Sequence, residues 1–408
     1  YCDETSDCKN GFSCNLETHG CEAMEDAGVD SAGSCGLDDD CTSGVCRGDG
    51  SCELAENILY VSPDGVSAGT CPEDHRCEIS YALSKSTATT STIRLANGTY
   101  DLASDLVVDR TRPDVTIVGG RAAVIRRTAT GVAIDVRGVS GGVGPTLTLR
   151  GMTINKGLNC YWAGLRLESV LFDNAPAESV PWVATNVCVL VVEKTEMHDS
   201  PGDGIKGEYT DLEMSGSTVS NSQGFGISLT GSAGHGVVAI ERSTISRNLK
   251  IGVQILSGTS FTLQRSFVSN NHLGGVESTG HVFDIANNFV VRNGGQGNTL
   301  GVDSSHFGGL HLVGSGGSRL IHNTVAMNNS DVNGIYVIGV DCDPATTSNN
   351  IVSSNQRGNE ELPYAATRGT CSFAGSLIDM TYTGPVFVDI ITDNFHIASA
   401  SPAVNAGG

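Results

Sequence analysis

A short phrase recurs along the C-terminal two-thirds of this 408-residue chain. Its copies read LEMSGSTVSNS from Leu212, VAIERSTISRN from Val238, FTLQRSFVSNN from Phe261, FDIANNFVVRN from Phe283 and RLIHNTVAMNN from Arg319. Self-similarity at a period of roughly 20 to 50 residues is typical of stacked repeats, in which each unit buries its apolar side against its neighbours. The repeat therefore predicts a solenoid and argues against a single globular core.

The copies can be aligned on one apolar anchor each, spaced by about 22 residues in the regular stretches. Short runs of alternating apolar and polar residues flank each anchor, and alternation at period two is a strand pattern. Asn and Gly separate these runs, and both residues tolerate the backbone of a tight corner. We therefore predict an all-β fold, a single-stranded parallel β-helix of about 10 to 12 rungs. The anchors are Ile154, Phe172, Met197, Val219, Ile245, Val268, Val290, Val325 and Val352.

Asparagine follows the anchor by three residues in five copies. Rungs of a parallel β-helix stack about 4.8 Å apart, so equivalent side chains lie on one another. Stacked amides can each donate to one neighbour and accept from the other. A ladder is thus one interpretation, and the frequent use of Asn in turns is the other. The predicted ladder consists of Asn248, Asn271, Asn293, Asn328 and Asn355.

The sequence LYVSPDGVSAGTC, followed by CEISYAL, IRLANGTY and VTIVGG, opens the repeat region, and FHIASASPAVNAGG closes the chain. With these motifs, residues 57–408 resemble the right-handed parallel β-helix proteins of the pectin-lyase-like group. The resemblance implies an N-terminal cap and first rungs over 57–125, regular rungs over 147–355 and C-terminal rungs with a tail over 356–408. It also implies a short capping helix between Glu78 and Ser86. The group includes lyases, hydrolases, epimerases, adhesins and structural spikes, so it predicts the fold and no single activity.

Fourteen cysteines, an even number, indicate an oxidising compartment. Eight of them form two similar groups, in residues 1–21 and 35–56, separated by an acidic linker over 22–34. Segments this short need disulfides to fold, and the absence of a CxxC spacing disfavours zinc. They resemble small Dickkopf-type or EGF-like modules, with pairings left open. The first group is Cys2, Cys8, Cys14 and Cys21, and the second is Cys35, Cys41, Cys46 and Cys52. For the other six cysteines, proximity in the sequence predicts the pairs Cys71 with Cys77, Cys160 with Cys188 and Cys342 with Cys371.

The formal net charge is −21, which makes nucleic acid a poor partner because nothing neutralises the phosphates. Cations, or a neutral or basic surface, are better candidates. No apolar run reaches the length of about 18 residues that spans a bilayer. The chain begins without an initiator Met, so we interpret it as a processed protein that is extracellular or held at the cell surface.

Candidate chemistry is sought in columns of equivalent residues that face outward. The column after each glycine pair is polar and mixed, and with two tryptophans from the insertion at 158–186 it forms a predicted binding strip. One acidic turn, HDSPGDGIKGE, is the densest cluster of ionisable groups and supplies alternative catalytic candidates together with that strip. The binding strip is Lys206, Gln254, Glu277, His311 and Tyr336, with Trp162 and Trp182, and the catalytic alternatives are Asp199, Asp203, Lys206, Glu277 and His311.

Two hypotheses follow. The first is a non-catalytic extracellular structural or binding protein, adhesive or filament-forming, that self-associates or binds polysaccharide. The second is a secreted polysaccharide lyase or hydrolase acting on an anionic polysaccharide, which would need paired carboxylates or a carboxylate cluster for calcium. No column carries such a set, so the first hypothesis is favoured and no cofactor is assigned, although Ca²⁺ stays an open alternative.

Overall fold

The computed structural model describes residues 35–142, 144–173, 180–232, 236–294, 308–330, 339–357, 367–378 and 401, and the backbone of strands at 12–15, 20–23, 387–389 and 394–397. The chain divides into two compact units, Tyr1–Ile58 and Leu59–Gly408. No helix in the described part of the chain is long and apolar enough to cross a membrane.

The first unit contains little regular structure. Strands β1 (Phe12–Asn15) and β2 (Gly20–Ala23) pair in antiparallel fashion, and two single-turn 3-10 helices follow, η2 (Asp38–Asp40) and η3 (Ala55–Asn57). Two disulfides, Cys35–Cys46 and Cys41–Cys52, close overlapping loops in residues 35–52. The pairing of Cys2, Cys8, Cys14 and Cys21 is not described, and the predicted linker over 22–34 lies outside the described residues from position 24 onward.

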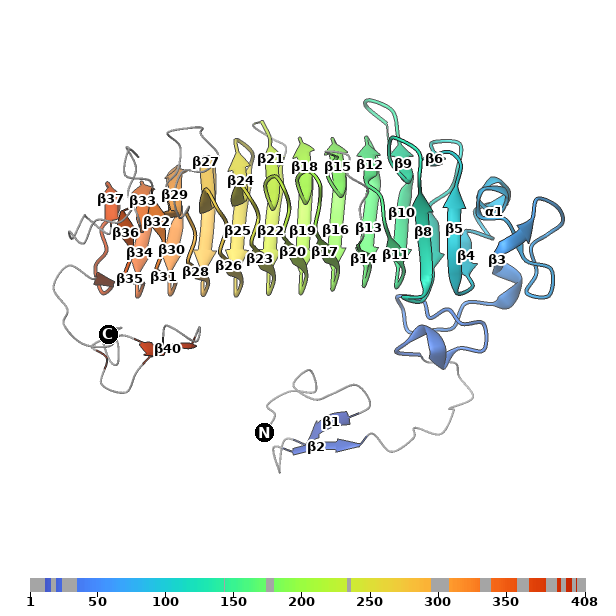
Figure 1. Ribbon diagram of the computed structural model, residues 1–408, viewed down its shortest axis with the longest axis horizontal. Helices are drawn as coiled ribbons and strands as arrows, with labels where there is room; N and C mark the ends of the chain where they lie inside the picture. Colours follow the sequence, from blue (N-terminus) through green and yellow to red (C-terminus); the bar gives the residue numbers. More distant parts are fainter. Residues whose placement is uncertain are drawn as a thin grey trace. The chain divides into compact units, whose positions relative to one another are not determined.

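The second unit is the predicted parallel β-helix, in which each rung contributes one strand to each of three faces (Figure 1). Strand β3 (Ile58–Val66) and helix α1 (Ile79–Lys85) precede the rungs, and β3 pairs with the first strand of face 1. Helix α1 begins after Glu78 and ends before Ser86, as the sequence predicted. Face 1 comprises β4 (Thr92–Leu95), β7 (Val115–Val118), β10 (Thr146–Arg150), β13 (Gly164–Glu168), β16 (Val189–Glu193), β19 (Asp211–Ser215), β22 (Val237–Glu241), β25 (Ser260–Gln264), β27 (Gly274–Ala286), β30 (Arg319–Ile321) and β34 (Thr346–Ser348).

Face 2 is a 12-stranded sheet, which agrees with the predicted number of rungs. It comprises β5 (Gly98–Leu102), β8 (Ala123–Arg127), β11 (Thr153–Ile154), β14 (Leu171–Phe172), β17 (Glu196–His198), β20 (Thr218–Ser220), β23 (Thr244–Ser246), β26 (Phe267–Ser269), β28 (Phe289–Val291), β31 (Thr324–Ala326), β35 (Ile351–Ser353) and β38 (Leu377–Ile378).

Face 3 follows face 2 in each rung, and β27 continues without a break from face 3 into face 1. Two pairs lie apart from the faces: β32 (Asn329–Ser330) with β36 (Gln356–Arg357), and β39 (Phe387–Asp389) with β40 (Asn394–Ile397). Face 3 comprises β6 (Leu106–Asp109), β9 (Ile134–Arg137), β12 (Leu158–Tyr161), β15 (Val183–Asn186), β18 (Ile205–Glu208), β21 (Ile227–Thr230), β24 (Ile251–Leu256), β27, β29 (Gly308–Gly314), β33 (Val340–Asp343) and β37 (Thr367–Gly369).

The nine predicted anchors form one continuous column inside face 2. Ile154 pairs with Phe172, and the register continues rung by rung to Val325 and Val352. All nine anchor side chains are fully buried. Burying an aliphatic side chain stabilises a fold by about 1.5–3 kcal/mol, so the column supplies much of the hydrophobic driving force.

The asparagine ladder lies at the corner between faces 2 and 3. The Asn248 side-chain amide donates to Asn271 Oδ1 at 2.8 Å, and Asn271 donates to Asn293 Oδ1 at 2.9 Å. The same contacts continue to Asn328 and Asn355. Each Oδ1 also accepts the backbone N–H of the preceding ladder residue, so donors at a buried corner are satisfied.

The glycine column beside this ladder is explained by close packing between rungs. A Cβ on Gly226 would lie 2.5 Å from the carbonyl oxygen of Gly252, and a Cβ on Gly275 would lie 2.5 Å from that of Gly309. The final member is Gly339, whose carbonyl faces Gly309. The predicted strip member Tyr336 follows another glycine pair, Gly334 and Ile335, but the register places Gly339 and Val340 next to Gly309 and Leu310, and residues 334–336 lie outside the described part of the chain.

Three disulfides join residues of the second unit in the pairing that proximity predicted: Cys71–Cys77, Cys160–Cys188 and Cys342–Cys371. The latter two each connect an inward residue of face 3 to the corner of the next rung. One rung after Cys160–Cys188, the same place is occupied by Thr185 and Thr210, whose hydroxyls hydrogen-bond at 2.8 Å. The rungs are thus fastened at this corner by covalent bonds or by hydrogen bonds.

Candidate functional site

A continuous row of polar side chains lies on the outer side of face 3. It consists of one residue per rung from β18 to β37, and the strand register places these residues directly beside one another. Seven residues at a rung height of about 4.8 Å span roughly 29 Å along the solenoid axis. We call this set the polar row: Lys206, Ser228, Gln254, Glu277, His311, Asp341 and Arg368.

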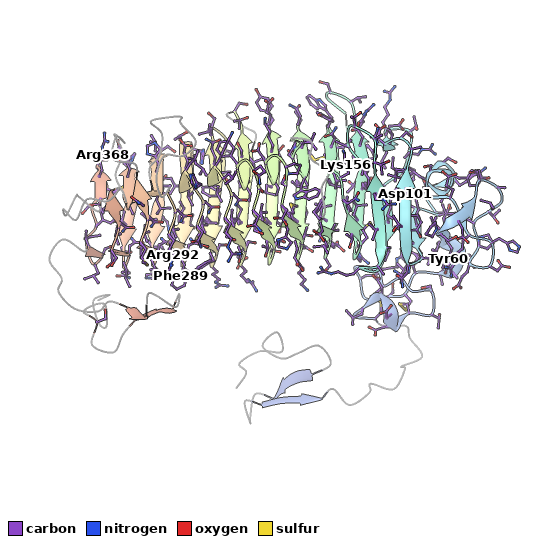
Figure 2. All side chains as sticks on the ribbon, in the orientation of Figure 1. Tyr60, Asp101, Lys156, Phe289, Arg292 and Arg368 are labelled. Atoms are coloured by element: carbon purple, nitrogen blue, oxygen red, sulfur yellow. A yellow bond between two sulfur atoms is a disulfide. The ribbon has the colours of Figure 1, made fainter. Side chains whose placement is uncertain are left out.

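Hydrogen bonds within the polar row position its central side chains. The Ser228 hydroxyl donates to Gln254 Oε1 at 2.9 Å, and Gln254 Nε2 donates to Glu277 Oε2 at 2.8 Å. His311 Nδ1 lies 3.3 Å from Asp341 Oδ2, and these two side chains are 17% and 14% exposed. Half-buried groups that are already positioned lose little freedom when a ligand binds. Figure 2 labels Arg368, which ends the row on β37.

The outer sides of the other two faces have a different character. On face 2, the column from Ser220 to Ser353 consists of small side chains, and Ser269, Val291 and Ala326 in it are buried. On face 1, acidic and basic groups neutralise one another, as between Arg150 and Glu168 at 2.6 Å. Among the described residues, the outer side of face 3 thus differs from both in having a continuous row of polar side chains that are neither buried nor all paired with opposite charge.

The structure brings some, but not all, of the residues of the predicted binding strip together. Lys206, Gln254, Glu277 and His311 all belong to the polar row, but Tyr336 does not. The next partner of His311 is Asp341, because the rung resumes at Gly339 and not at Gly334. Tyr336 itself lies outside the described residues. Sequence reasoning missed Asp341 and Arg368, although Gly339-Val340-Asp341 has the same glycine–aliphatic signal.

The predicted acidic turn does not form a compact cluster. Asp203 Oδ1 accepts the backbone N–H of Phe225 at 2.8 Å and so supports the turn of the next rung. Glu208 accepts a hydrogen bond from Asn186 at 3.2 Å on the outer side of face 3. In the described part of the chain, no hydrogen bond or ion pair connects Lys206 with Asp199 or Asp203. Asp199 and Asp203 thus have positions typical of solenoid corners.

The two tryptophans differ, and one prediction about them was wrong. Trp182 is 1% exposed, donates its indole N–H to the carbonyl of His198 at 2.8 Å and packs against Phe172 with ring centroids 5.3 Å apart. It is a core residue and not a member of a binding strip. Trp162 is half-buried at the corner that follows β12, next to face 3.

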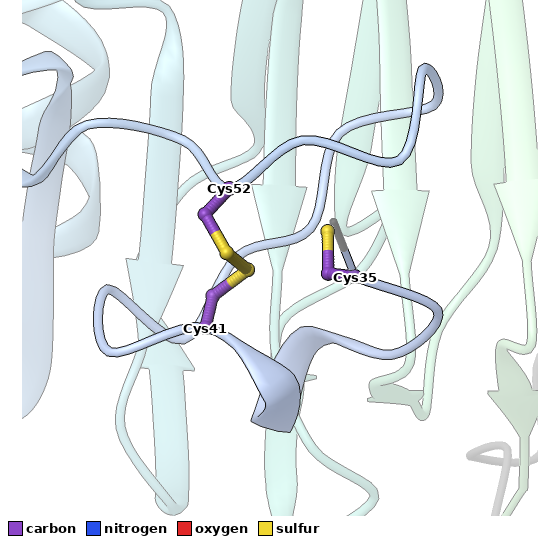
Figure 3. A group of neighbouring side chains, drawn as sticks. All are labelled: Cys35, Cys41 and Cys52. Carbon is purple, nitrogen blue, oxygen red and sulfur yellow. A yellow bond between two sulfur atoms is a disulfide. The ribbon is translucent and has the colours of Figure 1, made fainter. Parts of the chain in front are cut away.

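Metal ligation finds little support among the residues that the structure describes. Their one close group of His, Cys, Asp or Glu side chains is Cys35, Cys41 and Cys52 (Figure 3). Cys41 is disulfide-bonded to Cys52 and Cys35 to Cys46. Metals bind thiolates, and disulfide sulfurs are not thiolates. This group therefore does not fit a metal centre.

Comparisons with known proteins address the fold. Among solved structures, pectate lyase Pel9A is 14% identical, with 86% of this chain and 91% of that chain covered and a TM-score of 0.38. The A-module of mannuronan C-5 epimerase AlgE4 from Azotobacter vinelandii is 13% identical, with 80% and 98% covered and a TM-score of 0.43. At these identities the likeness concerns the fold alone. No curated protein matches the chain.

A family model described as "Right handed beta helix region" matches residues 182–297 and 226–395. Together these matches span more than half of the 408 residues. They cover the asparagine ladder, the polar row and the anchor column from Met197 onward. The chain belongs to the right-handed β-helix family.

Proposed function

We propose that this protein is an extracellular binding protein whose ligand is a polysaccharide lying along the polar row of face 3. The observation that carries the proposal is the unbroken series of hydrogen-bonding side chains from Lys206 to Arg368, one per rung. A linear polymer rich in hydroxyl groups needs donors and acceptors at regular intervals. The row supplies an ammonium, a hydroxyl, an amide, carboxylates, an imidazole and a guanidinium at intervals of about 4.8 Å.

The extracellular part of the proposal is supported by the disulfides. Five are described, three of them in the solenoid, and all described cysteines are paired. Disulfides persist in oxidising environments and are rare in the reducing cytosol. Self-association into oligomers or filaments remains a prediction, to be tested by sedimentation velocity over a range of protein concentrations.

The experiment is a binding assay on a panel of soluble polysaccharides, by affinity electrophoresis and calorimetry. The variants Gln254→Ala and His311→Ala remove two members of the polar row and are expected to weaken binding about tenfold each, since a lost hydrogen bond to a ligand costs roughly 1.5 kcal/mol. Glu213→Ala changes an exposed residue of face 1 and serves as the matched control. Equal binding by all three variants would contradict the proposal.

A catalytic role is a second candidate because Glu277, His311 and Asp341 occupy consecutive rungs. Glu277 and Asp341 are two rungs apart, roughly 10 Å along the stack. That separation is near the upper limit for the carboxyl pair of an inverting glycosidase, which is about 6.5–9.5 Å. Asp341, 3.3 Å from His311, would hold the imidazole in position as a general base.

This second candidate makes a separate prediction. New reducing ends, or unsaturated uronides detected by ultraviolet absorbance, should form from a bound polysaccharide, and Glu277→Gln and Asp341→Asn should each abolish their formation. Binding without any product under these conditions would exclude the catalytic reading and leave the binding proposal intact.

A further inference from the structure

Large apolar residues occupy a strained position at the corner between faces 3 and 1. Trp162, Val187 and Tyr209 have φ of 53°, 51° and 51°, in the left-handed region. Backbone hydrogen bonds place them in consecutive rungs, because Trp162 N–H donates to Asn186 O and Val187 N–H donates to Glu208 O. Later rungs have Gly231, Ser257 and Gly280 at this position. The fold thus does not require bulky residues there.

The other corners have left-handed residues too, but this backbone costs most for bulky and β-branched residues such as those found here. The side chains at this corner are also exposed: Tyr161 by 39%, Tyr209 by 40% and Val189 by 55%. We call Tyr161, Trp162, Val187, Val189 and Tyr209 the aromatic ridge. An exposed ring and a left-handed backbone coincide at Tyr209, whereas Trp162 and Val187 are left-handed and half-buried.

The aromatic ridge adjoins the start of the polar row. Lys206 and Glu208 both point outward from β18, and Tyr209 follows them at the corner. Asn186 donates to Glu208 Oε2 at 3.2 Å, between the levels of Trp162 and Tyr209. Those two aromatic residues are separated by two rungs, about 10 Å, which is comparable with the length of two linked pyranose rings. Aromatic faces and hydrogen-bonding groups therefore alternate over a short distance.

The charges near both surfaces disfavour an anionic ligand. Lys206 and Arg368 are the cations of the polar row, and Glu208, Glu277 and Asp341 oppose them. The whole chain has a net charge of −21, so a polyanion would be repelled at long range. In the residues that the structure describes, no carboxylate cluster is placed to hold Ca²⁺ as a bridge to uronate groups.

We infer that the ligand is an uncharged linear glycan, whose sugar rings stack on the aromatic ridge before the polymer continues along the polar row. The apolar C–H faces of a pyranose ring with equatorial substituents match an aromatic face. Its hydroxyls meet Asn186, Glu208 and Lys206. This inference rests on the proposed function and specifies its ligand class and the place where binding begins.

The test compares uncharged glycans (a β-glucan, a xylan and a mannan) with polygalacturonate and alginate, using the intact protein. The variants Trp162→Asn and Tyr209→Asn remove the rings, and asparagine tolerates the left-handed backbone, so neither should lower the unfolding temperature. Each is expected to weaken binding of the uncharged glycan by about tenfold. Phe289→Ala, which removes a 38%-exposed ring from face 2, is the matched control.

Two further readouts separate the possibilities. The chain has 2 tryptophans and Trp182 is buried, so protection from acrylamide quenching on ligand addition reports on Trp162. Binding should also change little between about 0.05 and 0.5 M salt, because an uncharged ligand forms no ion pairs that salt could screen.

Salt-sensitive binding of the anionic polymers alone would overturn the inference and leave the proposed function standing. The inference would also be overturned if Gln254→Ala weakened binding of the uncharged glycan and the ridge variants did not. Failure to bind any polysaccharide would instead contradict the proposed function itself. If a ridge variant unfolds at a lower temperature, the replaced residue has a structural role. In that case, protection of wild-type Trp162 from acrylamide quenching decides whether the ridge contacts sugar.

Discussion

Single residues at the corners of the solenoid adopt a backbone that most side chains avoid. Left-handed residues recur at the same corner in several rungs, as at Lys194, Arg242 and Arg265 between faces 1 and 2, each with φ of 49°. A left-handed conformation costs an L-residue roughly 1–2 kcal/mol, and the cost is highest for β-branched side chains. The stacking of the rungs compensates for this cost. A substitution that removes the backbone strain at one corner should therefore increase the free energy of unfolding.

Val187→Gly is the direct test of corner strain. The change should raise the free energy of unfolding by about 1 kcal/mol, because glycine adopts φ of 51° without a steric penalty. Val189→Gly, two residues later in the extended strand β16, is the matched control and should lower it by about 1 kcal/mol. Urea unfolding monitored by circular dichroism measures both. A Val187→Gly variant as unstable as Val189→Gly would show that this corner is not strained.

A buried histidine provides a second prediction at this scale. Burial lowers the pKa of His281, which is 3% exposed and hydrogen-bonded to Ser278 at 2.9 Å. The unfolded chain therefore takes up this proton more readily than the folded chain. It follows that the free energy of unfolding falls as pH is lowered below the unfolded-state pKa of about 6.5.

Urea unfolding between about pH 7.5 and 5, a range that spans the unfolded-state pKa, isolates the effect when wild type is compared with His281→Gln. The variant should lose less stability than wild type as the pH falls. His75→Gln, which replaces a 79%-exposed histidine, is the control for the substitution itself. Identical slopes for wild type and His281→Gln would refute the assignment.

At the level of secondary-structure elements, two ladders hold the corners. The predicted one begins at Asn248. A second one, between faces 1 and 2, was missed: Ser217 N–H donates to Ser243 Oγ at 3.2 Å, and Asn288 N–H donates to Asn323 Oδ1 at 3.0 Å. Its members change from hydroxyls to amides along the chain, so no single residue type marks the column. A repeat can be recognised in the sequence when the same residue type recurs, whereas the corner requires only that some side-chain oxygen accepts the backbone N–H.

Asn271→Ala tests the ladder. The change leaves the Asn248 amide and backbone N–H without their acceptor at a buried corner. It should lower the free energy of unfolding by about 2–4 kcal/mol, since each unsatisfied buried group costs roughly 1–3 kcal/mol. Asn270→Gly, at the adjacent left-handed residue with φ of 56°, is the control and should be neutral or stabilising. A loss below about 0.5 kcal/mol for Asn271→Ala would mean that water replaces the ladder.

Much of the structure of a rung could be predicted from sequence because equivalent positions in every rung have the same packing environment. The anchors, the asparagine column and the glycine column each repeat one residue type for one physical reason. The prediction failed at Gly334-Ile335, which has the same glycine–aliphatic sequence as Gly339-Val340. The packing of Gly339 against Gly309 identifies the second pair as the member of the column. The aromatic ridge could not be recognised from sequence, because left-handed strain at Val187 has no residue signature.

The whole solenoid is a one-dimensional stack in which each rung contacts its neighbours. Breaking one rung should therefore act locally. Ile245→Asp places a charge in the middle of the anchor column, and amides of β22, β23 and β26 should lose protection from hydrogen exchange. Those of β6 and β9, several rungs away, should keep it. Loss of protection along the entire stack would show that the solenoid unfolds as one cooperative unit.

The most direct test of the account is a structure of the protein with a bound uncharged oligosaccharide, by crystallography or electron microscopy. We predict sugar density on face 3, with a ring stacked on Tyr209 or Trp162 and hydroxyls within hydrogen-bonding distance of Lys206 and Gln254. Density confined to face 1 or face 2, or a saturated complex that leaves the polar row in contact with solvent alone, would contradict it.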